Sequence, residues 1–220
     1  MKKLILFYTL FCCALSASAQ GWKPYKIDDS VQVSLPPGFT KTDTLGQTVI
    51  NASTSFGNIV VTKQPDDPAT TPDIEKVKHL KSYYDDFVKR ISSTSKGTVK
   101  DERDTAMGKL RIKEFTLEVD SGSGKQFRNI RILHENSATY TFQFLYKEIH
   151  ADYARPESEK FFSSIAMTEN VGVKTQFTKP ENTTGKSASG NNMLLYGGGA
   201  ALLIIIVVII IASRLKRHRP

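Results

Sequence analysis

The chain has very little cysteine, and what it has lies at one end. Its two cysteines, Cys12 and Cys13, fall within the apolar N-terminal stretch, so the rest of the chain contains none. A disulfide framework and a cysteine nucleophile are therefore excluded beyond that stretch. A domain there has to fold on its apolar core alone, and about 150 residues provide enough chain for one ordinary core.

Histidine is also scarce, and its spacing does not suit a metal site. Three histidines lie between the N-terminal stretch and the C-terminal histidine, at His79, His134 and His150. They are far apart, and none has a partner four residues away on one helix face. The best pair is His150 with Asp152. The acidic groups Asp66-Asp67 and Asp101-Glu102-Asp104 do not follow a calcium-loop pattern, so we interpret them as solvated charges and expect no metal and no cofactor.

Motifs for nucleophilic and phosphate chemistry are missing as well. The chain has no Gly-x-Ser-x-Gly elbow. Gly122-Ser123-Gly124-Lys125 fails as a phosphate loop, because Val119 and Gln126 stand where a glycine and a Ser or Thr are needed. His134 and Glu135 are a candidate acid/base pair, but adjacent residues on a strand face opposite sides. We therefore predict that the chain is not an enzyme and keep a hydrolase as the weakest alternative.

The excess of positive charge belongs to the two ends of the chain. The formal net charge is +8 and the pI is about 9.4, but two of the 30 basic residues are Lys2 and Lys3, and four lie in the last eight positions. The part between them holds 24 basic and 22 acidic residues, a net charge of only +2. With no basic stripe interleaved with aromatics, nucleic acid is not an expected partner.

The N-terminus has the pattern of a secretory signal peptide over residues 1–19. Lys2 and Lys3 precede an apolar run from Leu4 to Leu15. The small residues Ala17 and Ala19 then come before Gln20, which predicts cleavage after Ala19. The sequence therefore predicts export of the chain from Gln20 onward.

The C-terminus has the pattern of a membrane anchor. Residues 193–212 carry no charge, and at about 1.5 Å per residue they span roughly 30 Å, the thickness of the hydrocarbon core. The basic tail, residues 213–220, comes next with the stop-transfer residues Arg214, Lys216, Arg217 and Arg219. The glycine triplet at residues 197–199 leaves a second interpretation open, in which this segment is a sorting signal that is removed.

The two ends together predict a single-pass type I protein of the bacterial cytoplasmic membrane, with its N-terminal domain on the periplasmic side. The bacterial assignment rests on the short signal peptide with its two lysines and on the exported domain without cysteine. We expect a globular domain over residues 20–170 and a polar, flexible tether over residues 171–192.

Within residues 20–170, the pattern predicts an α+β domain with an antiparallel sheet. Strands are expected at residues 31–35, 48–54, 56–63, 110–119, 127–133 and 140–146. An amphipathic helix is expected to start with Thr71 as N-cap and Pro72 in its first turn and to end in the stretch from Ser92 to Gly97. A second helix is expected to begin at about Pro156. The aromatic residues of the last strand are interpreted as a core face.

Three segments carry a resemblance to a known family. They are Val31-Gln32-Val33-Ser34-Leu35-Pro36-Pro37-Gly38-Phe39, Tyr140-Thr141-Phe142-Gln143-Phe144 and Glu159-Lys160-Phe161-Phe162-Ser163-Ser164-Ile165. Over residues 25–167 the chain resembles the PsbP/Mog1-like (DcrB-like) family, which implies an α/β/α sandwich around an antiparallel sheet. Because the relatives are photosystem accessory subunits, transport cofactors and envelope proteins, the resemblance implies a non-catalytic module for binding or assembly.

Two functional hypotheses remain besides the hydrolase. The first is an accessory protein, anchored in the membrane, that binds or assembles with a partner protein of the membrane or envelope. The second is a domain that binds a small ligand or a metal in the cleft between the long helix and the sheet.

Overall fold

The computed structural model describes residues 21–44, 46–120, 122, 124–168 and 173–178. The predicted signal peptide with its cleavage site, the predicted anchor and the basic tail lie outside these residues and stay predictions. Among the helices of the described part, none is long and apolar enough to cross a membrane.

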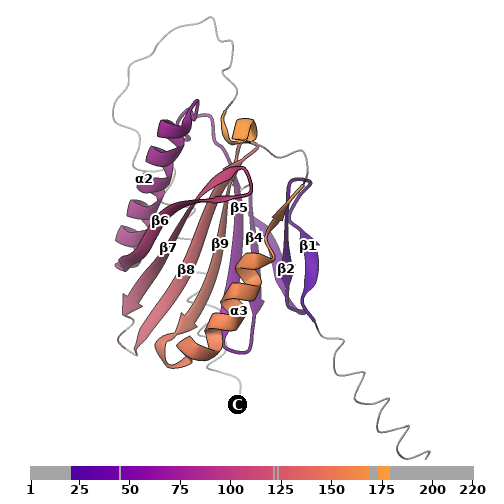
Figure 1. Ribbon diagram of the computed structural model, residues 1–220, viewed down its shortest axis with the longest axis vertical. Helices are drawn as coiled ribbons and strands as arrows, with labels where there is room; N and C mark the ends of the chain where they lie inside the picture. Colours follow the sequence, from indigo (N-terminus) through magenta and orange to yellow (C-terminus); the bar gives the residue numbers. More distant parts are fainter. Residues whose placement is uncertain (1–20, 45, 121, 123, 169–172, 179–220) are drawn as a thin grey trace, which may run out of the picture.

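A large antiparallel sheet forms the body of the domain (Figure 1). Its strand order is β3-β4-β5-β9-β8-β7-β6. The strands are β3 (Thr40–Thr44), β4 (Gln47–Ser53), β5 (Gly57–Pro65), β6 (Thr98–Met107), β7 (Leu110–Asp120), β8 (Lys125–Glu135) and β9 (Ala138–Lys147). All six pairings are antiparallel. This confirms the predicted antiparallel α+β class, including the turn between β7 and β8 in place of a phosphate loop.

A small sheet lies beside the large one. It contains β1 (Lys23–Lys26), β2 (Val31–Leu35) and β10 (Ala166–Met167), in the order β1-β2-β10. The predicted strand at residues 31–35 is confirmed, and its alternate residues Val31, Val33 and Leu35 are fully or almost fully buried. The small sheet therefore closes one side of the main core.

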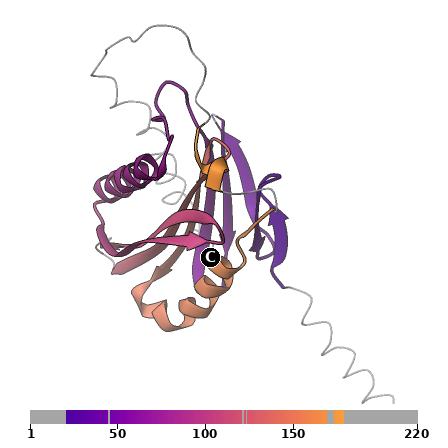
Figure 2. The same ribbon diagram turned by 45° about the horizontal axis from the view of Figure 1, so that its top comes forward.

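Two helices cover opposite faces of the large sheet. They are α2 (Val77–Ser95) and α3 (Ala151–Ser163), which comes after the 3-10 turn η2 (Glu148–His150). Phe142 and Phe144 of β9 pack against α3, whereas Ile130 and Ile132 of β8 pack with the buried face of α2. On β8, Arg131 lies between Ile130 and Ile132 and is the cross-strand partner of Phe142. Because cross-strand partners share a face and side chains alternate along a strand, the aromatic rings of β9 point to the face opposite the two isoleucines. In Figure 2 the strands run between the helices.

The aromatic row of β9 is a core face, as predicted. Tyr140, Phe142 and Phe144 are at most 1% exposed. Strand β7 is buried on both of its faces: Ile112 belongs to the core that α3 covers and Phe115 to the core beneath α2. The apolar positions of this strand change parity between Ile112 and Phe115, and burial on both faces is the reason.

Helix α2 begins later than the sequence predicted. Its first residue is Val77 and its N-cap is Lys76, so Thr71 and Pro72 do not start it. The reason is a two-hydrogen-bond bridge that holds the chain extended at Ile74: its N–H donates to Oγ1 of Thr178, and its carbonyl accepts from the N–H of Thr178. The helix ends at Ser95, within the predicted stretch from Ser92 to Gly97, and its C-cap Lys96 is in the left-handed region. Hydroxyls in the last turn donate to carbonyls of the preceding turn.

Helix α3 begins earlier than predicted. It starts at Ala151, which places Pro156 inside the helix instead of in its first turn. Pro156 has no N–H for the carbonyl one turn back, and one lost bond does not end the helix here. Ala154 and Phe161 are fully buried, so packing holds the helix on the sheet across the proline.

The packed chain extends beyond the expected domain boundary at residue 170. A 3-10 turn, η3 (Val173–Gln176), lies against the end of the sheet, and Gln176 is fully buried. The N–H of Asn136 donates to the carbonyl of Thr175. Residues 173–178 therefore belong to the packed domain and not to the expected tether at residues 171–192. The part of that tether from residue 179 onward lies outside the described residues and stays a prediction.

Candidate functional site

A cavity of about 480 Å³ opens between the first turns of α2 and the β6–β7 hairpin. Its lining comes from three elements: Val77, Leu80, Lys81 and Tyr84 of α2, Asp104, Thr105 and Ala106 of β6, and Lys109, Arg111 and Ile112 of the hairpin turn and β7. Leu80 and Lys81 each lie three or four positions from both Val77 and Tyr84, so the four residues share one helix face. Its volume falls within the range of small-ligand sites, about 300–1,000 Å³.

The floor of the cavity is apolar and its rim is basic. Leu80 is 1% exposed, and Val77 at the cavity edge is 40% exposed, unusually high for valine. Ala106 and Arg111 are a cross-strand pair and so share the face of the sheet that α2 covers. Arg111 and Lys109 are exposed, and within the described part of the chain neither makes an ion pair with a carboxylate.

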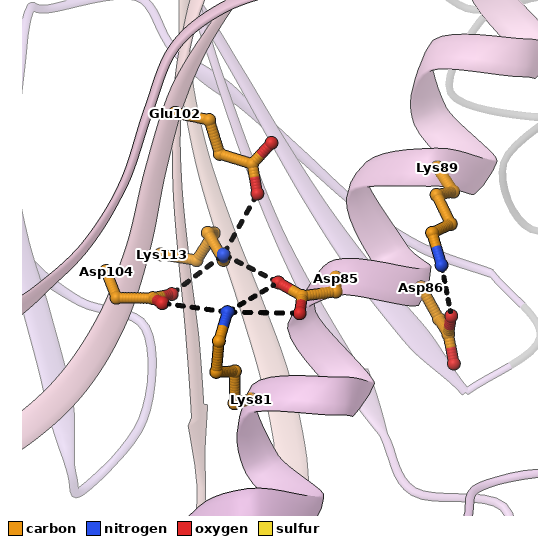
Figure 3. A network of polar contacts seen from close by, with 7 residues as sticks. All are labelled: Lys81, Asp85, Asp86, Lys89, Glu102, Asp104 and Lys113. Atoms are coloured by element: carbon orange, nitrogen blue, oxygen red, sulfur yellow. Dashed lines mark hydrogen bonds and ion pairs between the residues drawn. The ribbon is translucent and has the colours of Figure 1, made fainter.

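One wall of the cavity belongs to a network of five charged side chains (Figure 3). At its centre is Lys113 of β7, whose side chain is only 2% exposed. Its Nζ atom lies 2.7 Å from Asp85 of α2, 2.7 Å from Asp104 and 3.0 Å from Glu102 of β6. Lys81 bridges Asp85 and Asp104 at 3.1 and 3.0 Å. Two ammonium groups and three carboxylates thus fasten the helix to two strands.

The network fixes the charge of its members. Burial lowers the pKa of Lys113, but the hydrogen bonds that its ammonium donates to Asp104, Asp85 and Glu102 outweigh this effect, so the pKa lies above its ordinary value. Burial raises the pKa of Asp85 and of Asp104, but bonds from Lys113 and Lys81 outweigh it and hold both pKa values below the usual range. The wall therefore stays ionised at neutral pH and contributes no proton donor or acceptor.

The back wall of the cavity is fixed by Tyr84. Its hydroxyl donates to the carbonyl of Arg111 at 3.1 Å and accepts from the backbone N–H of His134 at 2.9 Å. Burial raises the pKa of this phenol well above its ordinary value. Gln176 supports the same backbone, because it accepts from the N–H of Arg111 and donates to the carbonyls of Arg111 and His134. The C-terminal segment thus braces the cavity from behind.

The structure separates the predicted acid/base pair. His134 is fully buried on the α2 side, where Nδ1 lies 2.9 Å from the carbonyl oxygen of Gln176 and Nε2 lies 2.9 Å from Oδ2 of Asp66. Glu135 is also fully buried, and burial raises its pKa. Adjacent strand residues face opposite sides, as expected, so His134 and Glu135 do not form a catalytic pair.

The other candidates for metal binding are dispersed. The best sequence pair, His150 and Asp152, lies at the start of α3, where His150 packs against the ring of Phe56. Asp67 accepts hydrogen bonds from the backbone and side chains of its own turn. No group of three or more His, Cys, Asp or Glu side chains suited to a metal ion occurs in the described ranges.

A second surface feature is an exposed aromatic patch at the start of α3. Phe56 and Tyr153 stack with ring centroids 5.0 Å apart and are 38% and 64% exposed. Ile149, in η2 beside them in sequence, is 78% exposed. Glu157 of α3 holds the adjacent turn by accepting from the hydroxyl of Thr54 and the N–H of Phe56. The cavity between α2 and the β6–β7 hairpin combines a defined volume with two exposed basic side chains, so it is the better candidate site.

The cavity residues were only partly visible in the sequence. The acidic group Asp101-Glu102-Asp104 has the pattern of solvated strand-end charge, but Glu102 and Asp104 bind a buried lysine. Lys113 could have been flagged, since it lies between Ile112 and the buried Phe115 in a strand with two buried faces. Lys109 and Arg111 give no sequence signal of their own, because their role depends on the position of α2.

The fold and the cavity together define a small α+β domain with a cavity on one face of its sheet. No family model matches the chain, and no curated protein matches it. Among solved structures, it is similar to cyanobacterial PsbP (CyanoP) from Synechocystis sp. PCC 6803, with a TM-score of 0.51 and 13% identity, over 68% of this chain and 94% of that one.

Two further solved structures are more distant. One is a protein of unknown function from Pseudomonas aeruginosa described as a putative regulator, with a TM-score of 0.39 and 8% identity over 63% of this chain and 92% of that one. The other is the Ran-binding protein Mog1p of Saccharomyces cerevisiae, with a TM-score of 0.40 and 11% identity over 73% of this chain and 100% of that one. The likeness to CyanoP gives this chain the PsbP/Mog1-like fold, as the resemblance predicted, and it gives the fold alone.

Proposed function

We propose that the chain is a membrane-anchored binding or assembly module of the bacterial envelope, without catalytic activity, and that the cavity between α2 and the β6–β7 hairpin is its binding site. The observation that carries the proposal is the cavity itself. It combines an apolar floor at Leu80 with two exposed basic side chains, Lys109 and Arg111, on a rim fastened by the Lys113 network.

The absence of catalysis is supported by how the titratable groups are used. Both ring nitrogens of His134 contact oxygens of the protein, and the Tyr84 hydroxyl is committed to two backbone groups. Proton transfer in catalysis needs a group within reach of the substrate and titrating near the working pH. The ionised wall of Lys81, Asp85 and Asp104 is suited to holding a ligand in place.

The membrane location is supported by the sequence. The predicted signal peptide (1–19), the anchor (193–212) and the basic tail (213–220) give one consistent topology. A tether beginning near residue 179 would still keep the domain close to the bilayer, at a high effective concentration for partners in the membrane. Mass measurement of the mature protein tests this: we expect a chain that starts at Gln20 and keeps its C-terminus, whereas loss of residues after the glycine triplet would support the sorting-signal interpretation.

A small ligand is the second candidate for the same site. It is favoured by the cavity volume of about 480 Å³, which suits a small molecule better than a broad protein interface. Both candidates use the same lining residues, so the experiment has to distinguish a captured protein from a captured small molecule.

Photocrosslinking in intact membranes tests the proposed function. A photoreactive amino acid is placed at Ala106 in the cavity lining, and a matched one at exposed Thr42 on β3, the opposite edge strand of the sheet. We expect the same envelope protein to be captured repeatedly from Ala106 and not from Thr42. Recovery of only the chain itself, or equal capture from both positions, would argue against the proposal.

A further inference from the structure

The cavity rim has a charge pattern that selects its ligand. Arg111 presents a planar guanidinium and Lys109 an ammonium, and neither is neutralised by a carboxylate within the described residues. The other two charged groups of the lining, Lys81 and Asp104, neutralise each other at 3.0 Å. The rim therefore offers two formal positive charges to a ligand and no unpaired negative one.

The floor beneath the rim selects an apolar group. The exposed part of Val77, together with Leu80 and Ala106, continues the apolar surface inward from the basic groups. A ligand that fills this space removes apolar surface from water, which favours binding. A purely ionic ligand would leave that surface in contact with water, and a purely apolar one would leave the two cations unused.

We propose that this cavity binds an amphipathic carboxylate of the fatty-acid type, with its carboxylate on Arg111 and Lys109 and its alkyl chain on the floor formed by Val77, Leu80 and Ala106. This inference rests on the proposed function, since it takes the same cavity as the binding site. A carboxylate matches the guanidinium fork of Arg111 with two parallel hydrogen bonds, as a phosphate does, but it carries one negative charge, whereas a phosphate monoester carries close to two at pH 7. The Lys113 network beside the site holds two ammonium groups and three carboxylates, and its net charge of −1 disfavours a doubly charged group.

Calorimetric titration of the full-length chain in lipid nanodiscs tests the proposal, with empty nanodiscs as the blank. The probes are octanoate, octyl phosphate and octyltrimethylammonium, which share one alkyl chain and differ in charge. We expect saturable binding of octanoate, weaker binding of octyl phosphate and no saturable binding of the cation. Tighter binding of octyl phosphate than of octanoate, or equal binding of the cation, would overturn it.

Variants locate the binding. The double variant Lys109→Ala/Arg111→Ala should weaken octanoate about ten-fold or more, because it removes two charge-assisted contacts. The control Lys23→Ala/Lys26→Ala removes the same charge from exposed positions on β1 and should leave binding unchanged. Ala106→Trp should fill the cavity and abolish binding. Equal affinity in all variants would overturn the proposal.

The test separates this inference from the proposed function. If Ala106 captures an envelope protein in membranes but octanoate does not bind, the binding module stands and the carboxylate ligand is rejected. If octanoate binds as predicted but no protein is captured, the ligand is supported and the role in assembly is rejected.

Discussion

The Nζ atom of Lys113 lies 2.7 Å from Oδ1 of Asp85, so a buried lysine of β7 is bonded directly to a carboxylate of α2. This contact crosses from the sheet to the helix that covers it, and Asp104 and Glu102 of β6 complete it. Two of these carboxylates, Asp85 and Asp104, also bind Lys81 at the cavity edge. The stability of the helix and the shape of the cavity are therefore coupled.

Replacing Lys113 with methionine should destabilise the domain. The substitution keeps a long apolar stem and removes the ammonium, which leaves three carboxylates close together without their shared partner. Loss of one member of a buried ion pair costs about 3–5 kcal/mol. The carboxylates here are 33–49% exposed and regain some water, so we expect about 1–3 kcal/mol, measured by urea denaturation.

Lys89→Met is the matched control for this substitution. Lys89 lies on α2, about one turn after Asp85 (Figure 3). Its side chain is 78% exposed, and its Nζ atom lies 3.5 Å from Oδ1 of Asp86. An exposed pair of this kind contributes at most about 0.5 kcal/mol. Equal effects of the two substitutions would show that the Lys113 network adds no more stability than a surface ion pair.

Acid should weaken the ion-pair network that holds α2 on the sheet. The pKa values of Asp85 and Asp104 are held below their ordinary values, because hydrogen bonds from the two lysines outweigh the effect of burial. As the pH falls, these two carboxyl groups take up protons in the unfolded chain before they do so in the folded one. The free energy of unfolding that they contribute is therefore fully present above their pKa in the unfolded chain and is lost as the pH falls through their pKa in the folded protein. We expect the urea midpoint to fall steadily below about pH 5.

The variant Asp85→Asn/Asp104→Asn isolates this effect. It should be less stable than the parent chain at pH 7, and its urea midpoint should fall less between pH 7 and pH 3, because two of the linked carboxylates are gone. Parallel pH profiles for variant and parent would mean that the acid sensitivity arises elsewhere, for example at Glu114, whose pKa Arg103 and Arg131 also hold low against the effect of burial.

Much of the fold can be predicted from short-range patterns in the sequence. The alternation in β2 and β9 and the helical spacing of Leu80, Tyr84 and Phe87 each report which residues face a core, and the structure buries those residues. Helix boundaries were less accurate, because long-range contacts decide them. Ile74 is held extended by Thr178, more than a hundred positions away, and no local preference at Thr71 or Pro72 reports that.

The site was harder to predict than the fold. A cleft between the long helix and the sheet was expected as one possibility, but its lining depends on which strands lie next to α2. Lys109 and Arg111 are ordinary surface residues until the strand order places β6 and β7 beneath the helix. Gln176 was hidden for another reason: it lies in a polar segment that resembles a tether in composition, although its amide is buried against Arg111 and His134.

Replacing Gln176 with alanine should loosen the base of the cavity. The change leaves the N–H of Arg111 without its side-chain acceptor and removes one donor to the carbonyl of His134, whereas the carbonyl of Arg111 keeps the hydroxyl of Tyr84. Each buried group left unsatisfied costs about 1–3 kcal/mol. Because water can enter where the side chain was, we expect a total loss near the lower end of that range, with faster hydrogen exchange at the amide of Arg111. Lys174→Ala, at an exposed position of η3, is the control.

Gly57 is the first residue of β5, where the chain enters the sheet below α3. A Cβ atom at this position would lie 2.6 Å from ring carbons of Phe144 and 2.8 Å from the carbonyl oxygen of Leu145. Phe144 is fully buried against Phe161 of α3, so its ring has no free space into which to move. Gly57→Ala should therefore destabilise the domain by about 1–3 kcal/mol through overpacking.

The matched control is Gly21→Ala, where an added Cβ meets nothing within 4 Å. The two variants carry the same chemical change, so their difference in urea midpoint measures the contact with Phe144 and Leu145 and not a general effect of alanine on the unfolded chain. If Gly57→Ala were as stable as Gly21→Ala, β5 would have to move away from β9. That movement would be seen as faster hydrogen exchange along the β5–β9 pairing, which the structure places in the centre of the sheet.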